Sequence, residues 1–489
     1  DLSVAPSDDF YQYATGTWMK NNPVPEEESR WSSFNQLSEK NNIVLHSILE
    51  KISSSDSSIN NLDNQLLADF YTSFMDTLSR SEHSFSPMIK YYRYIDKTPN
   101  TANFHNKIKN SVNFHKTISW LQNMGFSNLF GLYVAQDKKN NSIYRVHLHQ
   151  GGMGLPNRDY YFKNDERSEK IRAAYQSFMS KMLVLGGISK LSEFEDGISS
   201  ESRRIYDLEE KIARVCKSPV QLREVEKQYN PYAVSELNEL CPNISWNEFL
   251  FSRNIVDQDT IIVGQPDFFK GINDLIDSIS LEDWKLYFKW NMLRSVSKAF
   301  SMESNRLNFS FYNTTLRGTK KMKPLWKQGI QAVTSSAIGE LLGKAFVKDN
   351  FSPNANRKVN LMVDNITLVF EERINSLDWM SDSTKIKANQ KLAAFSRKLG
   401  FPDKWEDFDI NITKDNYLQN VINCRRFKIR KNISKLGKPI DKKKWSMFPQ
   451  IVNAYYSPLL NEIVFPAGIM QKPFFSEDYE DAVNYARMG

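Results

Sequence analysis

The sequence predicts a mainly helical protein with a smaller α+β part, arranged in two lobes. Three observations support this fold class. The chain has 489 residues, more than a single core usually organises. Apolar residues recur at three- and four-residue steps through most of the chain up to about residue 395, which is typical of amphipathic helices. Strand-like patterns occur in only two places, within residues 129–150 and 451–466.

The helical patterns begin after a proline-containing break. Residues 22–25 (NPVP) interrupt an N-terminal segment that carries Trp18 and Trp31. The helix-period positions that follow fall into three groups: Ile43, Leu45, Ile48, Leu49, Ile52; Leu66, Leu67, Phe70, Phe74, Leu78; and Ile338, Leu341, Leu342, Ala345, Phe346. A serine-rich stretch at 53–58 predicts a loop between the first two groups.

Two regions predict strands. Tyr144, Val146 and Leu148 alternate with other residues and are followed by a glycine-rich turn at 151–154. Residues 451–456 (IVNAYY) and 461–466 (NEIVFP) predict two short strands joined by a turn at Ser457-Pro458. We therefore expect a large helical region flanked by pieces of an α+β unit.

Composition excludes several classes of protein. Hydrophobic residues make up 40% of the chain and aromatic residues 13%, which is enough to form cores and argues against disorder. The net charge of +7 is spread along the chain, and the densest basic run, at 442–444, directly follows Asp441. Such a run predicts a solvated turn and not a nucleic-acid patch. No apolar run reaches the roughly 18 residues of a membrane span.

Nucleophilic and phosphate-binding motifs are absent from the sequence. Cys216, Cys241 and Cys424 lie far apart without a CxxC pair, so we expect buried apolar roles and at most one disulfide. No G-x-S-x-G sequence is present. The glycine-rich turn at 151–154 lacks the lysine and hydroxyl residue of a phosphate loop.

The histidines supply no complete metal site. A catalytic zinc needs three protein ligands and an open position for water, and H-E-x-x-H places two imidazoles one helical turn apart. The six histidines form no such motif; they are His46, His83, His105, His115, His147 and His149. His147 and His149 share one face of a predicted strand, for which a solvated face is favoured over a metal site. The residues alone thus identify no catalytic group.

A set of short motifs, in order along the chain, resembles the neprilysin family of zinc metallopeptidases. The motifs are 8–14 (DDFYQYA) with Gly16 and Trp18, 29–31 (SRW) with Phe34, 154–161 (GLPNRDYY), 377–381 (LDWMS), 400–403 (GFPD), 452–456 (VNAYY) and 461–469 (NEIVFPAGI). Ser7 and Thr15 stand where secreted animal members have cysteines, so the chain is most similar to the disulfide-poor microbial branch.

The resemblance implies a two-lobed architecture in which a large helical lobe is inserted into a thermolysin-like catalytic lobe. Residues 1–38 and 386–489 are then expected to belong to the catalytic lobe, and 39–385 to the helical lobe that covers the cleft. In the family, an Asn-Tyr-Gly-Gly-like turn leads into the H-E-x-x-H helix. Residues 484–489 (NYARMG) resemble that turn, so we expect the zinc ligands to follow them and to be absent from this chain.

The resemblance also implies substrate-binding residues. Asn453 and Ala454 correspond to an edge-strand pair that holds the peptide backbone, which suits strand addition through main-chain hydrogen bonds. Arg30 corresponds to an arginine that meets a peptide carboxylate, and an ion pair with nearby glutamates is the open alternative. Phe34, Ile469 and Phe474 resemble the lining of the pocket for the residue after the cut, with core packing as the alternative.

The expected function is that of a zinc-dependent endopeptidase that cleaves short peptides on the amino side of apolar residues. This chain would supply the substrate cleft, while a companion chain or C-terminal segment would carry H-E-x-x-H, so the chain alone is expected to be inactive. The alternatives are a non-catalytic peptide-binding protein that lost its metal half and, less favoured, a helical scaffold for protein partners. No nucleic acid is implied. The chain begins at Asp1 without methionine, which with family habit favours an extracytoplasmic location and a removed leader or anchor.

Overall fold

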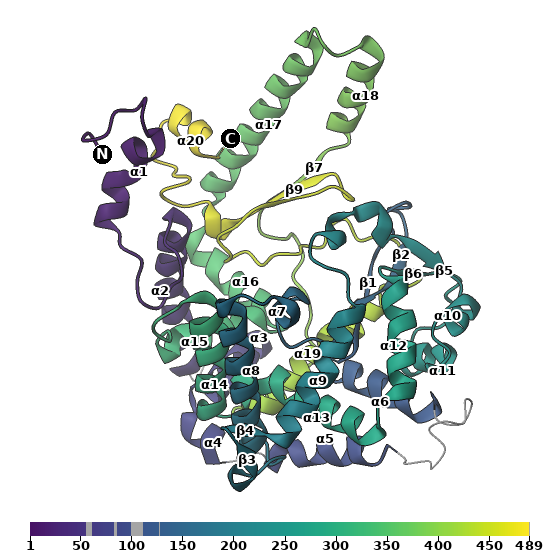
Figure 1. Cartoon of the computed structure of the whole chain (residues 1–489). Helices are drawn as coiled ribbons and strands as arrows, with labels where there is room; N and C mark the ends of the chain where they lie inside the picture. The colour runs from purple at the N-terminus through teal and green to yellow at the C-terminus, as the bar shows by residue number, and fades with distance from the viewer. Residues whose placement is uncertain (55–60, 83–85, 99–110, 127, 489) are drawn as a thin grey trace. The chain divides into compact units, whose positions relative to one another are not determined.

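The computed structural model describes residues 1–489 apart from 55–60, 83–85, 99–110, 127 and 489 (Figure 1). Contacts divide the chain into two units, and each unit is built from separated stretches of sequence. Unit 1 comprises Asp1–Tyr71, Arg317–Asp407 and Lys443–Gly489, and unit 2 comprises Thr72–Leu316 and Phe408–Lys442. The expected lobe boundaries at 38/39 and 385/386 rest on family resemblance and stay a prediction.

Unit 1 combines helices with a three-stranded sheet. Its elements are α1 (Phe10–Asn21), α2 (Ser33–Ser54), most of α3 (Leu62–Met75), α15 (Leu325–Ser335), α16 (Gly339–Asn350), α17 (Pro353–Ser376), α18 (Asp382–Ala393), β7 (Ser396–Gly400), β8 (Tyr455–Ser457), β9 (Glu462–Pro466), the 3-10 turn η6 (Ala467–Ile469) and α20 (Asp481–Met488). α1 ends at Asn21, directly before the proline-containing break, and this helix was not predicted.

α2 carries the first predicted amphipathic pattern. Leu37, Leu45 and Leu49 are buried at four-residue spacing, together with the polar Asn41, and they place one face of the helix against α15 and α16. Leucine burial at this spacing is what stabilises a helix whose intrinsic propensity is modest. The helices predicted around residues 43–52 and 338–346 are therefore confirmed.

The sheet of unit 1 has the order β7-β9-β8, with β9 in the centre. β8 pairs with β9 in antiparallel register, with Tyr455 opposite Val464, and the turn between them follows Ser457. The predicted hairpin is thus confirmed, although β8 is shorter than the predicted strand 451–456. β7 pairs with β9 in parallel register, and this strand was not predicted.

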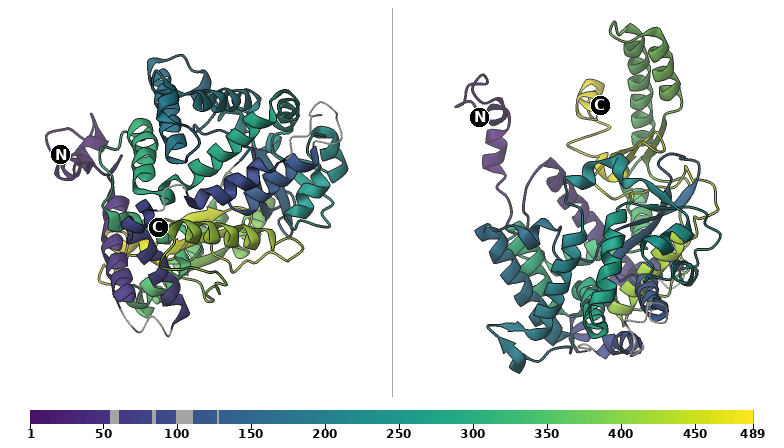
Figure 2. Two further views of the ribbon diagram at one scale, coloured as in Figure 1. Left: turned by 90° about the horizontal axis from the view of Figure 1, so that it is seen from below. Right: turned by 45° about the vertical axis from the view of Figure 1, so that its right-hand side comes forward.

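α17 and α18 run side by side as a helical hairpin that extends away from β7 (Figure 2). Ser352 caps α17 by accepting a hydrogen bond from the Ala355 N–H, and Pro353 stands at the first helical position. Seven large apolar side chains of this hairpin and its connection are exposed: Leu361, Ile366, Leu368, Val369, Phe370, Trp379 and Ile386. Such a concentration is unusual for a surface that faces only water.

Unit 2 is mainly helical and holds a four-stranded sheet. Its elements are α4 (Thr77–Glu82), α5 (Ser86–Asp96), α6 (Ser111–Asn123), β1 (Phe130–Gln136), β2 (Tyr144–Gln150), α7 (Asp159–Phe162), α8 (Glu166–Leu185), η2 (Leu191–Glu193), β3 (Phe194–Glu195), β4 (Ile198–Ser199), α9 (Ser200–Val215), η3 (Gln221–Arg223), η4 (Val225–Gln228), β5 (Asn230–Tyr232), α10 (Val234–Leu240), α11 (Trp246–Ser252), β6 (Ile261–Val263), α12 (Pro266–Ser278), α13 (Leu281–Phe300), α14 (Met302–Phe309), the π-helical η5 (Ser310–Thr315) and α19 (Tyr417–Ile433).

α13 forms the centre of the unit 2 core. Ser280 caps the helix through the Asp283 N–H, and Trp284, Tyr287 and Trp290 on the helix are fully buried. The helix contacts α5, α8, α9, α14 and α19. A helix with so many neighbours needs apolar and aromatic residues on most of its faces, and α13 carries them between its charged residues.

The sheet of unit 2 confirms the first predicted strand. β1 and β2 pair in antiparallel register over their whole length, and the sheet order is β1-β2-β6-β5. The glycine-rich turn follows β2, as predicted, and Gly152 there has a φ of 88°, which favours glycine.

Some local predictions need correction or lie outside the described residues. Residues 53 and 54 of the serine-rich stretch end α2, and 55–58 fall outside the described residues. Residues 484–488, expected to form a turn, are helical in α20. They contain no glycine or proline, and Asp481 stands in the first helical turn where it complements the helix dipole. The three cysteines are buried, as expected, and each is a free thiol in the structure.

Candidate functional site

The six residues expected to contact a peptide all belong to unit 1. They are Arg30, Phe34, Asn453, Ala454, Ile469 and Phe474. Two connections of the fold organise them: α2 packs against η6, and the β8–β9 hairpin leads directly into η6. Their role in binding is not tested by these positions and stays a prediction.

The structure brings the two phenylalanines together. The ring centroids of Phe34 and Phe474 are 4.6 Å apart with an interplanar angle of 52°. Phe34 is 45% exposed and Phe474 is half-buried, whereas Ile469 is buried. A partly exposed aromatic pair is consistent with the wall of an apolar pocket, and Ile469 has the burial of a core residue.

Asn41 fixes the position of η6 against α2. Its Nδ2 atom donates to the Gly468 carbonyl at 3.1 Å, and its Oδ1 atom accepts from Gln471 Nε2 at 2.9 Å. The side chain is only 2% exposed. A buried amide whose donor and acceptor are both used is an orienting contact, because losing it would leave buried polar groups unpaired. Asn41 therefore holds the segment that carries Ile469 and Phe474.

A close backbone approach fixes η6 from the other side. The Gly468 N–H donates to the Pro449 carbonyl at 2.7 Å. A Cβ atom on Gly468 would lie 2.5 Å from the Gln450 carbonyl oxygen, so only glycine allows this approach. Gln450 in turn donates through Nε2 to the Gly339 carbonyl at 2.9 Å. The chain that continues from Gln450 to Asn453 is thereby anchored beside η6.

Asn453 and Ala454 lie immediately before β8 and outside its paired residues. β8 is an edge strand of the described sheet, since the order is β7-β9-β8. Asn453 is exposed, and its Oδ1 atom accepts from the Ala454 N–H at 2.9 Å. That bond is local, so the amide nitrogen of Asn453 remains available as a donor.

Arg30 is exposed and lies three residues before the first residue of α2. The ion pairs that the sequence offers as an alternative are not formed among the described residues: Glu27 pairs with Lys327 and Glu28 with Lys323. No hydrogen bond or ring contact within the described part of the chain joins Arg30 or Asn453 to the aromatic pair. The structure therefore places Arg30 in the same unit as the other five residues, with no hydrogen bond or ring contact to the aromatic pair among the described residues.

A buried ion pair joins two strands of the unit 1 sheet. Lys398 on β7 and Glu462 on β9 form it, with Nζ and Oε2 2.8 Å apart and side chains 9% and 2% exposed. Lys398 also donates to the Lys444 carbonyl at 2.7 Å. The pair links two neighbouring strands and so supports the sheet that positions Asn453 and Ile469.

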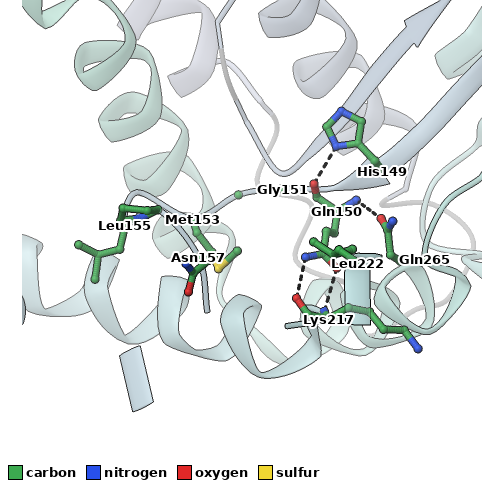
Figure 3. Close-up of a pocket in the computed structure, with 11 residues that line it drawn as sticks. His149, Gln150, Gly151, Met153, Leu155, Asn157, Lys217, Leu222 and Gln265 are labelled. Carbon is green, nitrogen blue, oxygen red and sulfur yellow. Dashed lines mark hydrogen bonds between the residues drawn. The ribbon is translucent and has the colours of Figure 1, made fainter. Parts of the chain in front are cut away.

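A pocket in unit 2 is lined by the end of β2 and the glycine-rich turn, with a volume of about 340 Å³ (Figure 3). The Gln150 N–H donates to Gln265 Oε1 at 2.7 Å, and Gln150 Nε2 donates to the Lys217 carbonyl at 3.0 Å. The Lys217 N–H also donates a hydrogen bond to Gln150 Oε1 at 2.8 Å. Since these polar groups bind one another, the walls are built for local structure and give no argument for catalysis.

His147 and His149 share a face of the unit 2 sheet, as predicted. Both rings contact Tyr133, with centroids at 5.0 Å for His147 and 5.5 Å for His149. The expectation of a solvated face is correct for His149 and wrong for His147, which is buried because Tyr133 stacks on it. Burial, opposed in part by Asp137, lowers the pKa of His147.

The described residues do not fit a zinc site. None of their His, Cys, Asp and Glu side chains gather in a group of three or more, and His83 and His105 lie outside the described part. The sequence itself contains no H-E-x-x-H. We therefore derive no catalytic step from a metal held by these residues.

Comparison with known proteins decides the family. Models described as Peptidase family M13 match residues 6–402 and 453–489, and the first match alone covers more than half of the chain. The chain belongs to peptidase family M13. The resemblance to neprilysin-type peptidases and the mainly helical fold are thereby confirmed.

Curated members of the M13 family match the whole chain. Neprilysin-3 of Drosophila melanogaster is 29% identical over 513 residues, with 100% of this chain and 63% of that protein covered. Endothelin-converting enzyme 1 of Rattus norvegicus is 30% identical over 508 residues, with 100% and 64% covered. The chain therefore spans less than two thirds of the length of these relatives.

A solved structure shows the same M13 fold. It is the zinc metalloprotease Zmp1 of Mycobacterium tuberculosis in complex with an inhibitor, and it superposes with a TM-score of 0.87 at 28% identity. The superposition covers 99% of this chain and 71% of the Zmp1 chain.

The sequence motifs proposed the aromatic and edge-strand residues, which stay a prediction, and gave no indication of the residues that hold them. Asn41 interrupts an apolar stripe formed by Leu37, Leu45 and Leu49, and a polar residue at such a position is a signal of a buried hydrogen bond. Lys398 and Glu462 gave no such signal, because they are paired by strand register and not by sequence spacing.

Proposed function

We propose that this chain forms the peptide-binding part of a zinc-dependent endopeptidase. The proposed reaction is cleavage of short peptides on the amino side of apolar residues. The observation that carries the proposal is the match to Peptidase family M13 across residues 6–402 and 453–489. Three features of unit 1 support it: an edge strand, an aromatic pair and an exposed arginine without an ion-pair partner among the described residues.

The edge strand suits capture of an extended peptide. β8 is paired with β9 on one side, and the residues leading into β8 present the exposed amide of Asn453. A peptide that adds beside such an edge gains main-chain hydrogen bonds, and the Asn453 amide supplies one more donor. We propose that Asn453 and Ala454 hold the peptide backbone in register.

The aromatic pair and Arg30 suit the side chain and the carboxylate of a short peptide. Phe34 and Phe474 present apolar surface next to the segment of Ile469. Arg30 has no ion-pair partner among the described residues, and a guanidinium binds a carboxylate through two parallel hydrogen bonds. We propose that the apolar residue after the cut contacts the phenylalanines, and that Arg30 meets the peptide's carboxylate.

The zinc ligands are proposed to come from residues other than these 489. Bound zinc would polarise the scissile carbonyl and lower the pKa of its water. The absence of H-E-x-x-H from the sequence supports an external source, which is a companion chain or a C-terminal segment. The exposed apolar side chains of α17 and α18 support the same idea, because an additional folded part would cover them.

The location proposed for the protein is extracytoplasmic, in keeping with the habit of the family. Among the described residues, no helix has the length and apolar character needed to cross a membrane.

Zinc and activity measurements on two preparations test the proposal. One preparation is the chain printed here, and the other adds the segment or companion that carries H-E-x-x-H. We expect the chain alone to lack bound zinc and to leave a fluorogenic peptide intact. The completed protein should hold about one zinc per chain and lose activity with a chelator. Hydrolysis of the peptide by the chain alone would refute the proposal that the zinc ligands lie outside these 489 residues. Peptide binding by a completed protein that holds no zinc would favour the non-catalytic alternative.

Asn453→Ala tests the peptide contact in the completed protein. We expect KM to rise about tenfold, which corresponds to one lost hydrogen bond to the peptide backbone. Asn411→Ala is the matched control, since it removes an exposed amide in unit 2. Equal kinetics for Asn453→Ala and the wild type would contradict the assignment and favour a scaffold role.

A further inference from the structure

We propose that unit 2 contains a binding site for a small organic anion, a phosphate or carboxylate group attached to an apolar body. The site is a pocket of about 720 Å³ between three segments of unit 2, residues 120–124, 253–258 and 426–437. This volume is within the range of small-molecule sites in proteins. The pocket shares no residue with the proposed peptide site, and it does not depend on the proposed peptidase function.

Arg253 is the residue that points to an anion. Its side chain is 3% exposed and lines the pocket, at the position that caps the C-terminal end of α11. Its Nε and Nη1 atoms are buried without a hydrogen-bond partner among the described residues. Burial lowers the pKa of Arg253 to about 10, so the group is still charged at neutral pH. Buried charges in proteins are normally paired, and an anion in the pocket would provide the partner.

Two further arginines strengthen the positive charge. Arg426 and Arg430 lie one helical turn apart near the end of α19, and both line the pocket. Asp257 is the acidic residue in the lining, and its side chain is exposed. The lining thus holds three arginines and one acidic residue, which leaves the pocket with a net positive charge.

Helix ends oppose this charge only in part. The C-terminal ends of α6, α11 and α19 border the pocket, and each contributes a partial negative charge of roughly half a unit that fades within one turn. Asn123 Nδ2 already donates to the Ser252 carbonyl at 2.8 Å, which satisfies one such group at the end of α11. For a ligand that reaches Arg253, the full positive charge of this side chain therefore outweighs the partial negative charges of the helix ends.

The remaining walls suit an apolar body. The apolar lining residues are Trp120, Met124, Val256, Ile429, Ile433 and Leu436. Trp120 is held by stacking on Tyr94, with centroids 3.8 Å apart and rings 15° from parallel. Val256 is 53% exposed, which indicates an open apolar side of the pocket. A rigid aromatic wall beside an arginine is suited to a ring that carries an anionic group.

The test is calorimetric titration of the chain printed here, without added zinc, with phenyl phosphate, phenylacetate and inorganic phosphate. We expect at least one aromatic anion to bind at least about tenfold more tightly than inorganic phosphate. The better of phenyl phosphate and phenylacetate identifies the headgroup. No binding of any probe up to about 10 mM, or equal binding of inorganic phosphate, would overturn the proposal.

Arg253→Met assigns the binding to this pocket. We expect the Kd of the tighter probe to rise at least tenfold, while the melting temperature stays equal or increases because an unpaired buried charge is removed. Arg223→Met is the control, since Arg223 is an exposed arginine of unit 2 outside the pocket. Arg430→Ala, on the solvent side, should weaken binding without unfolding the protein. An unchanged Kd in Arg253→Met, or equal losses in Arg223→Met, would overturn the assignment.

Discussion

Glu462→Ala is expected to lower the free energy of unfolding by about 3–5 kcal/mol, because it leaves the Lys398 ammonium buried without its partner. The two side chains are 2% and 9% exposed, and their charged atoms are 2.8 Å apart. The backbone carbonyl of Lys444 accepts a second bond from Lys398 but carries no formal charge to replace the carboxylate. Urea unfolding followed by circular dichroism measures the loss.

A double-mutant cycle separates the ion pair from general packing. Lys398→Met should also destabilise unit 1, whereas Lys398→Met combined with Glu462→Leu should recover most of the loss, since no buried charge remains. Additive losses would mean that the two residues are not coupled and would contradict the prediction. Because β9 continues directly into η6, the single variants should also weaken peptide binding.

Glu209→Ala is expected to destabilise the protein by at least about 4 kcal/mol, since three buried donors lose their acceptor at an estimated 1–3 kcal/mol each. The Glu209 carboxylate is fully buried and accepts from Tyr161 at 2.8 Å, Tyr175 at 2.9 Å and Trp290 at 3.1 Å. These donors come from α7, α8 and α13, while Glu209 lies on α9. One carboxylate thus joins four helices of unit 2.

The neighbouring residue provides the matched control. Glu210 pairs with Arg214 at the surface, one turn along the same helix. Glu210→Ala should lower the free energy of unfolding by less than about 1 kcal/mol, because exposed ion pairs contribute little to stability. A similar loss in both variants would show that the carboxylate of Glu209 has no special role in the core.

The stability contributed by Glu209 should depend on pH. Burial raises the pKa of this carboxyl above its ordinary value, against the opposing effects of Arg294 and the three donors. Between the unfolded and folded pKa values the folded state binds more protons, so the free energy of unfolding falls as pH rises through that window. Glu209→Gln should flatten this slope, which urea unfolding at several pH values would measure.

The sequence predicted those elements whose signals are local. The helix from residue 43 and the β8–β9 hairpin were predicted because leucine spacing and a proline-containing turn are visible within short windows. β7 was missed because Ser396, Arg397 and Lys398 give a polar pattern, and the strand exists only through its pairing with β9, about 65 residues later in the sequence.

The candidate site shows the same limit. Family motifs gave Asn453 and the phenylalanines, but their supports depend on three-dimensional proximity. Asn41 reaches Gly468, which is 427 residues away, and no local pattern predicts that contact. That Arg253 Nε and Nη1 have no hydrogen-bond partner in the described part of the chain could not be predicted either, because it depends on which acceptors the fold brings near.

The interleaved stretches of the two units have a consequence for the order of synthesis on the ribosome. Unit 2 has all of its residues once Lys442 has been made, whereas the contact between Asn41 and Gly468 must wait for residue 468. Chains emerge at roughly 5–20 residues per second, and domains generally fold as units while they do so. Unit 2 can therefore reach its final packing first, and α2 stays without its η6 partner until residues 467–469 have been translated.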